Sequence, residues 1–372
     1  MKPNNVHLKY FYLLVFYLFF SLQLSFGQDT TQHLRNFQLE AVVHYGFVAS
    51  HHKYMQHLTQ RHFSAFELNL SEQTHGWRLW EQLYKYPKRG IGIYYSTLGN
   101  TEVLGHAIAV YPYLNFCLTK GNKVNLYFKT AIGLGYLTKK FNADNNYKNI
   151  AISTHLNAFI QLKLTLNWNI TDRLVINGGF DISHFSNGAF KIPNLGLNIL
   201  SLNMGLSYKL SRITPNIIKR EVPAYNKKWQ YHVFGRFGVN ELYPPGGKKY
   251  PVYCMTAYFL KPLGIKRLLG VGLDIFYSES VVDYLRRSGT GIKNKVEAVK
   301  PGVSAVYEMN FSHLSFVVQF GAYLYAKDKS DGYIYDRVAL QYTFKNHYMV
   351  QLGMKTHWLK AEVVELSVGY KF

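Results

Sequence analysis

The feature that most constrains this chain is a strict alternation of apolar and polar residues over long segments. Between residues 156 and 168 every even position is apolar, and every odd position except Phe159 is polar. Successive side chains of a β-strand point to opposite faces, so this pattern indicates a strand with one apolar and one polar face. Barrel strands that cross a bilayer need about ten residues, whereas strands of soluble sheets usually have about five or six. The pattern therefore favours an all-β, outer-membrane antiparallel β-barrel over a soluble sandwich.

Further segments repeat the pattern, at 124–136 and at 364–372, and the chain stops on Phe372. A strand that ends on an aromatic residue resembles the assembly signal of bacterial outer-membrane barrels. The chain has 31 Tyr and 25 Phe, which suits the aromatic girdles of such barrels and excludes intrinsic disorder. Its 2 Cys exclude a disulfide scaffold and a Cys-rich metal site.

The alternation predicts two sets of strands, separated by a charged segment at 211–228 that contains Pro215 and Pro223. The first set is 38–50, 63–71, 89–98, 104–118, 124–137, 155–168, 174–184 and 198–210. The second set is 229–238, 250–260, 266–279, 300–311, 314–326, 333–344, 348–357 and 362–372. Periplasmic turns within a barrel are short and this connector is not, which favours two eight-stranded barrels; the alternative is one sixteen-stranded barrel.

The two sets resemble a repeat, because 206–210 (LSYKL) matches 368–372 (VGYKF) at the same strand position. Duplication and convergent barrel patterning both explain this similarity. The expected organisation is a barrel at 28–210, a linker at 211–228 and a degenerate eight-strand repeat at 229–372.

The N-terminus has the composition of a secretory signal peptide. Lys2 and Lys9 precede an apolar run, and the small residues Ser25 and Gly27 stand at the −3 and −1 positions before Gln28. We expect residues 1–27 to be removed and the mature chain to reach the bacterial outer membrane. Although the formal net charge is +21, secretion argues against a nucleic-acid partner.

Chemistry-bearing residues gather where the seventh predicted strand ends. If both termini lie in the periplasm, this strand ends at the extracellular rim. His184 is on its lipid-facing parity, Asn198 has that parity on the next strand, and Ser186 shares it if the strand continues. A polar group facing hydrocarbon is costly, which a substrate at the rim would justify.

His and Ser two residues apart on one face allow general-base activation of a Ser nucleophile. Asn198 could orient the imidazole. Oxyanion donors could come from the backbone N–H groups near Asn187 and Gly188 and from the Asn194 side chain. By itself His-x-Ser is also compatible with a girdle histidine and a loop serine. The imidazoles of His51, His52, His57 and His62 are scattered as in an ordinary loop, so no metal site is expected.

The run 184–198 (HFSNGAFKIPNLGLN) resembles the lipid A 3-O-deacylase family, also called acyloxyacyl hydrolases, in its His-x-Ser-Asn motif and its Pro-Asn-x-Gly segment. The resemblance implies an eight-stranded outer-membrane barrel that acts as a carboxylic ester hydrolase. It would remove the 3-O acyl chain of lipid A, the membrane anchor of lipopolysaccharide, without a cofactor. By motif position Ser186 is the nucleophile and His184 the base. The third member is Glu in the family pattern, but here it is Asn198.

The second set of strands does not repeat this motif. By parity Trp358 corresponds to His184 and Lys360 to Ser186, while His357 points inward, so 229–372 is expected to be non-catalytic. Basic clusters that include Lys139, Lys140 and residues of 280–299 could meet the phosphates of lipid A. The rival functions are a non-enzymatic barrel, for adhesion or as a pore, and a lipid-modifying acyltransferase.

Overall fold

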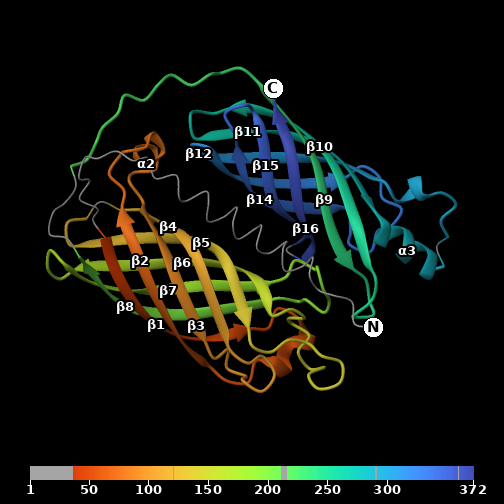
Figure 1. Ribbon diagram of the computed structural model, residues 1–372, viewed down its shortest axis with the longest axis horizontal. Helices are drawn as coiled ribbons and strands as arrows, with labels where there is room; N and C mark the ends of the chain where they lie inside the picture. Colours follow the sequence, from red (N-terminus) through yellow and green to blue (C-terminus); the bar gives the residue numbers. More distant parts are fainter. Residues whose placement is uncertain (1–36, 120, 211–215, 290, 359) are drawn as a thin grey trace. The chain divides into compact units, whose positions relative to one another are not determined.

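The computed structural model describes residues 37–119, 121–210, 216–289, 291–358 and 360–372. The signal peptide predicted at 1–27 lies outside these residues. Within them, sixteen strands form two closed barrels, β1–β8 and β9–β16 (Figure 1). The eight-plus-eight prediction is therefore confirmed, and the alternative of one sixteen-stranded barrel is wrong.

The first barrel consists of strands joined in chain order, with two short helices in its connections. Its strands are β1 Phe37–Ala49, β2 Phe63–Gln73, β3 Lys88–Ser96, β4 Ala107–Cys117, β5 Val124–Leu137, β6 Leu156–Asn169, β7 Leu174–Ser186 and β8 Leu197–Lys209. The 3-10 helix η1 (Lys53–Leu58) follows β1, and α2 (Leu79–Leu83) follows β2. The barrel closes because β1 pairs antiparallel with both β2 and β8, which leaves no edge strand.

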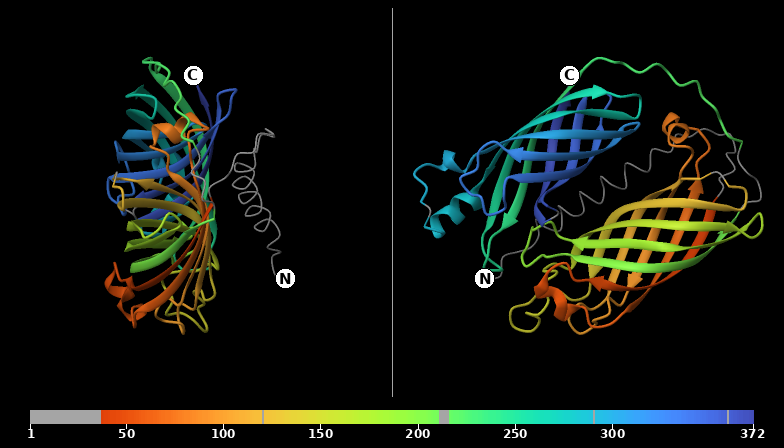
Figure 2. Two further views of the ribbon diagram at one scale, coloured as in Figure 1. Left: turned by 90° about the vertical axis from the view of Figure 1, so that its left-hand side faces the viewer. Right: turned by 180° about the vertical axis from the view of Figure 1, so that it is seen from behind.

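The second barrel has the same topology, and its first strand β9 pairs with β10 and with β16. Its strands are β9 Gln230–Glu241, β10 Lys249–Pro262, β11 Arg267–Ser278, β12 Lys300–Phe311, β13 Leu314–Tyr323, β14 Ile334–Thr343, β15 Tyr348–His357 and β16 Lys360–Lys371. Helices α3 (Glu279–Arg287) and η2 (Lys295–Ala298) lie between β11 and β12. Figure 2 shows the neighbouring strands of each barrel side by side. No helix in the described ranges is long and apolar enough to cross a membrane.

The alternation separates the two faces of each wall as expected. On β6, Gln161 and Lys163 are buried in the lumen, whereas Leu162 and Leu166 are 44% and 56% exposed on the outer surface. Apolar residues outside and polar residues inside are typical of a barrel surrounded by lipid. The predicted faces are therefore confirmed.

The first lumen is filled by a charged network centred on Glu67, which is fully buried. Its carboxylate contacts Lys129, lies 2.9 Å from Lys163 Nζ and lies 3.0 Å from His44 Nε2. The other nitrogen of His44 is 2.9 Å from Asp181 Oδ1. Buried charges need partners of this kind, so this lumen is a packed polar core.

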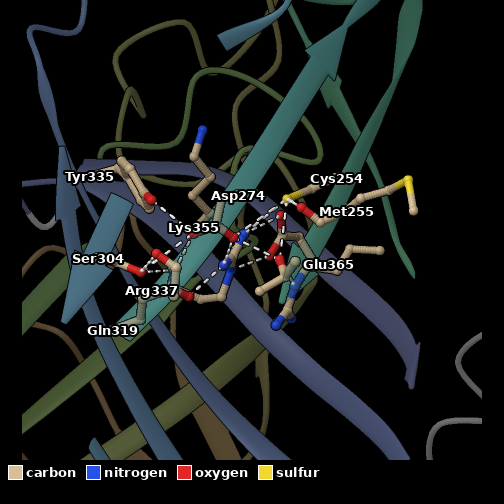
Figure 3. Close-up of polar contacts among 12 residues, drawn as sticks. Cys254, Met255, Asp274, Ser304, Gln319, Tyr335, Arg337, Lys355 and Glu365 are labelled. Atoms are coloured by element: carbon tan, nitrogen blue, oxygen red, sulfur yellow. Dashed lines mark hydrogen bonds and ion pairs between the residues drawn. The ribbon is translucent and has the colours of Figure 1, made fainter. Parts of the chain in front are cut away.

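The second lumen has a different network, drawn in Figure 3. Arg337 bonds Glu365 through Nε at 2.6 Å and Asp274 through Nη1 at 3.1 Å. Tyr335 donates to the same Asp274 carboxylate at 2.8 Å. Cys254 is buried beside these groups, and both it and Cys117 are free thiols.

Candidate active site

The candidate site lies where β7 ends and β8 begins. Antiparallel pairing places His184 directly opposite Asn198. His184 Nδ1 is 2.6 Å from Asn198 Oδ1. The neighbour Ser183 is fully buried in the lumen, whereas Ile182, which shares the parity of His184, is 45% exposed. The imidazole and the carboxamide therefore belong to the outer face of the barrel wall, and both are half-buried.

Ser186 is the last residue of β7, so the strand extends through it. Its side chain is nevertheless covered, since the residue is only 4% exposed. Its Oγ accepts hydrogen bonds from the Gly188 N–H at 3.1 Å and from Asn194 Nδ2 at 2.9 Å. In the part of the chain that the structure describes, no hydrogen bond joins Ser186 to His184. Both bonds to Oγ use its lone pairs, so its proton remains available for donation.

The loop 187–196 holds the Asn194 amide in this position. The backbone N–H of Asn187 donates to Asn194 Oδ1 at 3.1 Å, which turns Asn194 Nδ2 toward the serine. The Asn187 side chain in turn donates to Ser153 Oγ and Thr154 Oγ1, both at 3.1 Å. The N–H of Asn187 is thus already bonded to Asn194, while the Gly188 N–H and the Asn194 amide point at Ser186.

Gly196 lets the same loop pass against the imidazole. Its φ of +78° lies in the left-handed region that favours glycine. A Cβ at this position would lie 2.7 Å from Cε1 and 3.4 Å from Nε2 of His184. Any side chain here would therefore displace the imidazole or the loop.

His51 belongs to this cluster, although the sequence did not identify it. Asn198 Nδ2 lies 3.1 Å from His51 Nδ1, and His51 Nε2 lies 2.9 Å from the Leu195 carbonyl oxygen. The cause is barrel closure, because Ala49 at the end of β1 pairs with Asn198. The residues around His51 form no local sequence pattern that predicts the pairing of β1 with β8. Among the described residues, no group of three His, Cys, Asp or Glu side chains is arranged to hold a metal.

Asp181 is too deep to replace the missing carboxylate. It is 1% exposed, and its Oδ1 accepts from Ser201 Oγ at 2.8 Å and from Asn203 Nδ2 at 2.9 Å in the lumen. The carboxamide of Asn198 is therefore the group that contacts His184 Nδ1.

The second barrel carries different residues at the corresponding place. Trp358 is 68% exposed, and Lys360 forms an ion pair with Asp331 at 2.9 Å. His357 is buried and 2.8 Å from the Tyr323 hydroxyl. An outward imidazole with a neighbouring hydroxyl is thus missing from this position.

Comparison with known proteins finds a matching family model for each barrel. A model of the lipid A 3-O-deacylase family (PagL) matches residues 64–207, and a model of the acyloxyacyl hydrolase C-terminal domain matches residues 228–372. Similar solved structures include Neisserial surface protein A (NspA), with 8% identity, a TM-score of 0.34 and coverage of 47% of this chain and 97% of that one. The outer membrane enzyme PagL is 15% identical, with a TM-score of 0.30 and coverage of 45% and 97%. The comparison with curated proteins gives no significant match.

Proposed function

The chain belongs to the lipid A 3-O-deacylase family of outer-membrane hydrolases, and on that premise we propose that it is a serine esterase that removes the 3-O acyl chain of lipid A in the outer leaflet. The observation that carries the proposal is the pairing of His184, two residues before Ser186 on the same strand, with Asn198, together with the two N–H groups that donate to Ser186 Oγ. These are the parts that acyl transfer needs: a base with an orienting group, a nucleophile and oxyanion donors.

In the proposed reaction, Ser186 Oγ attacks the ester carbonyl carbon, and its proton passes to His184 Nε2. Asn198 Oδ1 accepts a hydrogen bond from the Nδ1–H group of the imidazole throughout the reaction. When the tetrahedral intermediate collapses, the bond between the acyl carbon and the sugar oxygen breaks, and His184 returns the proton to that oxygen. Water then attacks the acyl-serine with His184 again as base, which releases the fatty acid and restores Ser186.

The Gly188 N–H and Asn194 Nδ2 are the proposed oxyanion donors. Both already lie within 3.1 Å of Ser186 Oγ, and the oxyanion forms one bond beyond the carbon that Oγ attacks. Donors fixed in advance in this way stabilise the developing charge without reorganisation. Asn187, whose N–H is bonded to Asn194, acts by positioning that amide.

The outward parity of His184 supports a substrate that lies in the membrane. Ester groups of lipid A sit at the upper margin of the acyl layer, and a polar cluster on the outer wall reaches them without entry into the lumen. With the termini in the periplasm, β5 and β7 both run outward, so Lys139 and Lys140 after β5 share the end of the barrel that carries the site. They are the proposed contacts for lipid A phosphates.

The test is Ser186→Ala, compared with wild type by mass spectrometry of lipid A from cells that express each protein. The expected result is loss of one 3-O acyl chain with wild type and none with the variant. Ser183→Ala is the matched control, because this serine lies in the lumen of the same strand. Identical lipid A with and without the wild-type protein would contradict the proposal in favour of a non-enzymatic barrel, and a gain in mass would indicate an acyltransferase.

A further inference from the structure

We propose that His51 is a positioning residue, which orients the carboxamide of Asn198 so that its oxygen, and not its nitrogen, faces His184. The proposal rests on the proposed function, in which His184 must act as a base. His51 lies far from the motif in sequence. It follows β1, which pairs with β8 where the barrel closes.

The hydrogen bonds of His51 determine which nitrogen carries its proton. The Leu195 carbonyl oxygen can only accept, so His51 Nε2, at 2.9 Å, is the donor. Neutral His51 therefore presents a lone pair at Nδ1 and accepts from Asn198 Nδ2 at 3.1 Å. A carboxamide that directs its NH₂ group toward His51 must direct its oxygen toward His184.

The same chain of bonds then sets the tautomer of His184. Asn198 Oδ1, at 2.6 Å, can only accept, so the proton of a neutral His184 sits on Nδ1. Nε2 keeps its lone pair and can take the proton of Ser186. A reversed carboxamide would offer N–H to His184 Nδ1, which would move the imidazole proton to Nε2 and remove the base.

This orientation problem exists because residue 198 is Asn. Both oxygens of a carboxylate accept hydrogen bonds, so a carboxylate needs no partner to decide which end faces the imidazole. A carboxamide has one accepting and one donating end, and a second group must choose between its two orientations. His51 is placed to make that choice, because it holds Asn198 Nδ2 from the side opposite His184.

A purely structural role for His51 is the competing explanation, because its bond to the Leu195 carbonyl also fixes the loop 187–196. The two roles differ in their dependence on residue 198. Loss of a loop contact slows the enzyme whatever stands at 198. Loss of the orienting contact matters only while residue 198 is a carboxamide.

The experiment is a double-mutant cycle with His51→Phe and Asn198→Asp, assayed by release of fatty acid from lipid A vesicles. With Asn198 in place, His51→Phe should lower kcat roughly five- to tenfold with KM unchanged, the kinetic equivalent of about 1 kcal/mol. In the Asn198→Asp background, the same change should alter kcat by less than twofold. His52→Phe is the control, because the ring centres of His51 and His52 lie 4.8 Å apart in a tilted contact and a phenyl ring preserves that contact. Equal losses in both backgrounds, or no loss in either, would overturn the proposal.

A second measurement does not depend on activity. Nitrogen-15 NMR of histidine-labelled protein in detergent micelles reports which ring nitrogen of His184 is protonated. We expect the Nδ1–H form in wild type and a mixture of both tautomers in His51→Phe. An unchanged tautomer would refute the role of His51. If lipid A were the same with wild type and with Ser186→Ala, the esterase function would fail while this result still stood.

Discussion

Replacement of Gly196 by alanine tests whether the close packing of the loop 187–196 against the imidazole of His184 is needed for catalysis. The new Cβ would lie 2.7 Å from His184 Cε1. Carbon atoms pack at about 3.5–4.0 Å, so the imidazole or the loop must move by about 0.8 Å or more. A misplacement of about 1 Å in a catalytic group can cost about 10²-fold. We therefore expect Gly196→Ala to lower kcat by roughly 10- to 100-fold.

The same substitution also strains the backbone, because alanine at a φ of +78° costs roughly 1–2 kcal/mol. Gly246 is the matched control: its φ is +84°, and nothing lies within 4 Å of its Cβ position. Both variants should lose similar stability in thermal unfolding, but only Gly196→Ala should lose activity in the fatty-acid release assay. Equal activity of the two variants would refute the contact between Gly196 and the imidazole as a determinant of catalysis.

Three other substitutions probe the rest of the arrangement. Asn194→Ala removes one donor from Ser186 Oγ and should lower kcat by about 10²–10³-fold with little change in KM, measured by steady-state hydrolysis of lipid A. Asn198→Asp gives the imidazolium a charged partner of the same length. Because charge-assisted hydrogen bonds are about twice as strong as neutral ones, this variant should raise kcat by roughly three- to tenfold. A lower kcat would contradict the role assigned to the oxygen of residue 198. Glu67→Gln leaves Lys129, Lys163 and His44 without their shared carboxylate and should destabilise the first barrel by about 3–5 kcal/mol, visible as a lower unfolding midpoint in urea. An unchanged midpoint would show that the lumen compensates for the missing charge.

Alternation alone predicted the walls of both barrels with small errors at the strand ends. The predicted segment 124–137 coincides with β5, and 348–357 with β15. The segment 104–118 was too long at both ends, because β4 spans Ala107–Cys117 and is preceded by a turn and by Gly105, whose φ is +71°. The helix α3 was not predicted, since 266–279 was interpreted as a strand and 280–299 as a basic cluster.

The alternation also predicted which face of the barrel wall carries part of the candidate site. His184 and Asn198 share a parity on consecutive strands, so a local pattern sufficed to place them on one face. The burial of Ser186 follows instead from the loop that folds back over it, and the contact of His51 with Asn198 follows from the pairing of β1 with β8.

The period of two in side-chain direction is a local property, so the sequence by itself determined which segments are strands and which residues face lipid or lumen. The partner of β8 is a non-local choice, because the same alternation is compatible with pairing to β1 or to β9. Only the tertiary structure decided it, through closure of each sheet on itself, which satisfies the backbone hydrogen bonds of both edges. That closure is also what brings an imidazole from residue 51 to the carboxamide at residue 198.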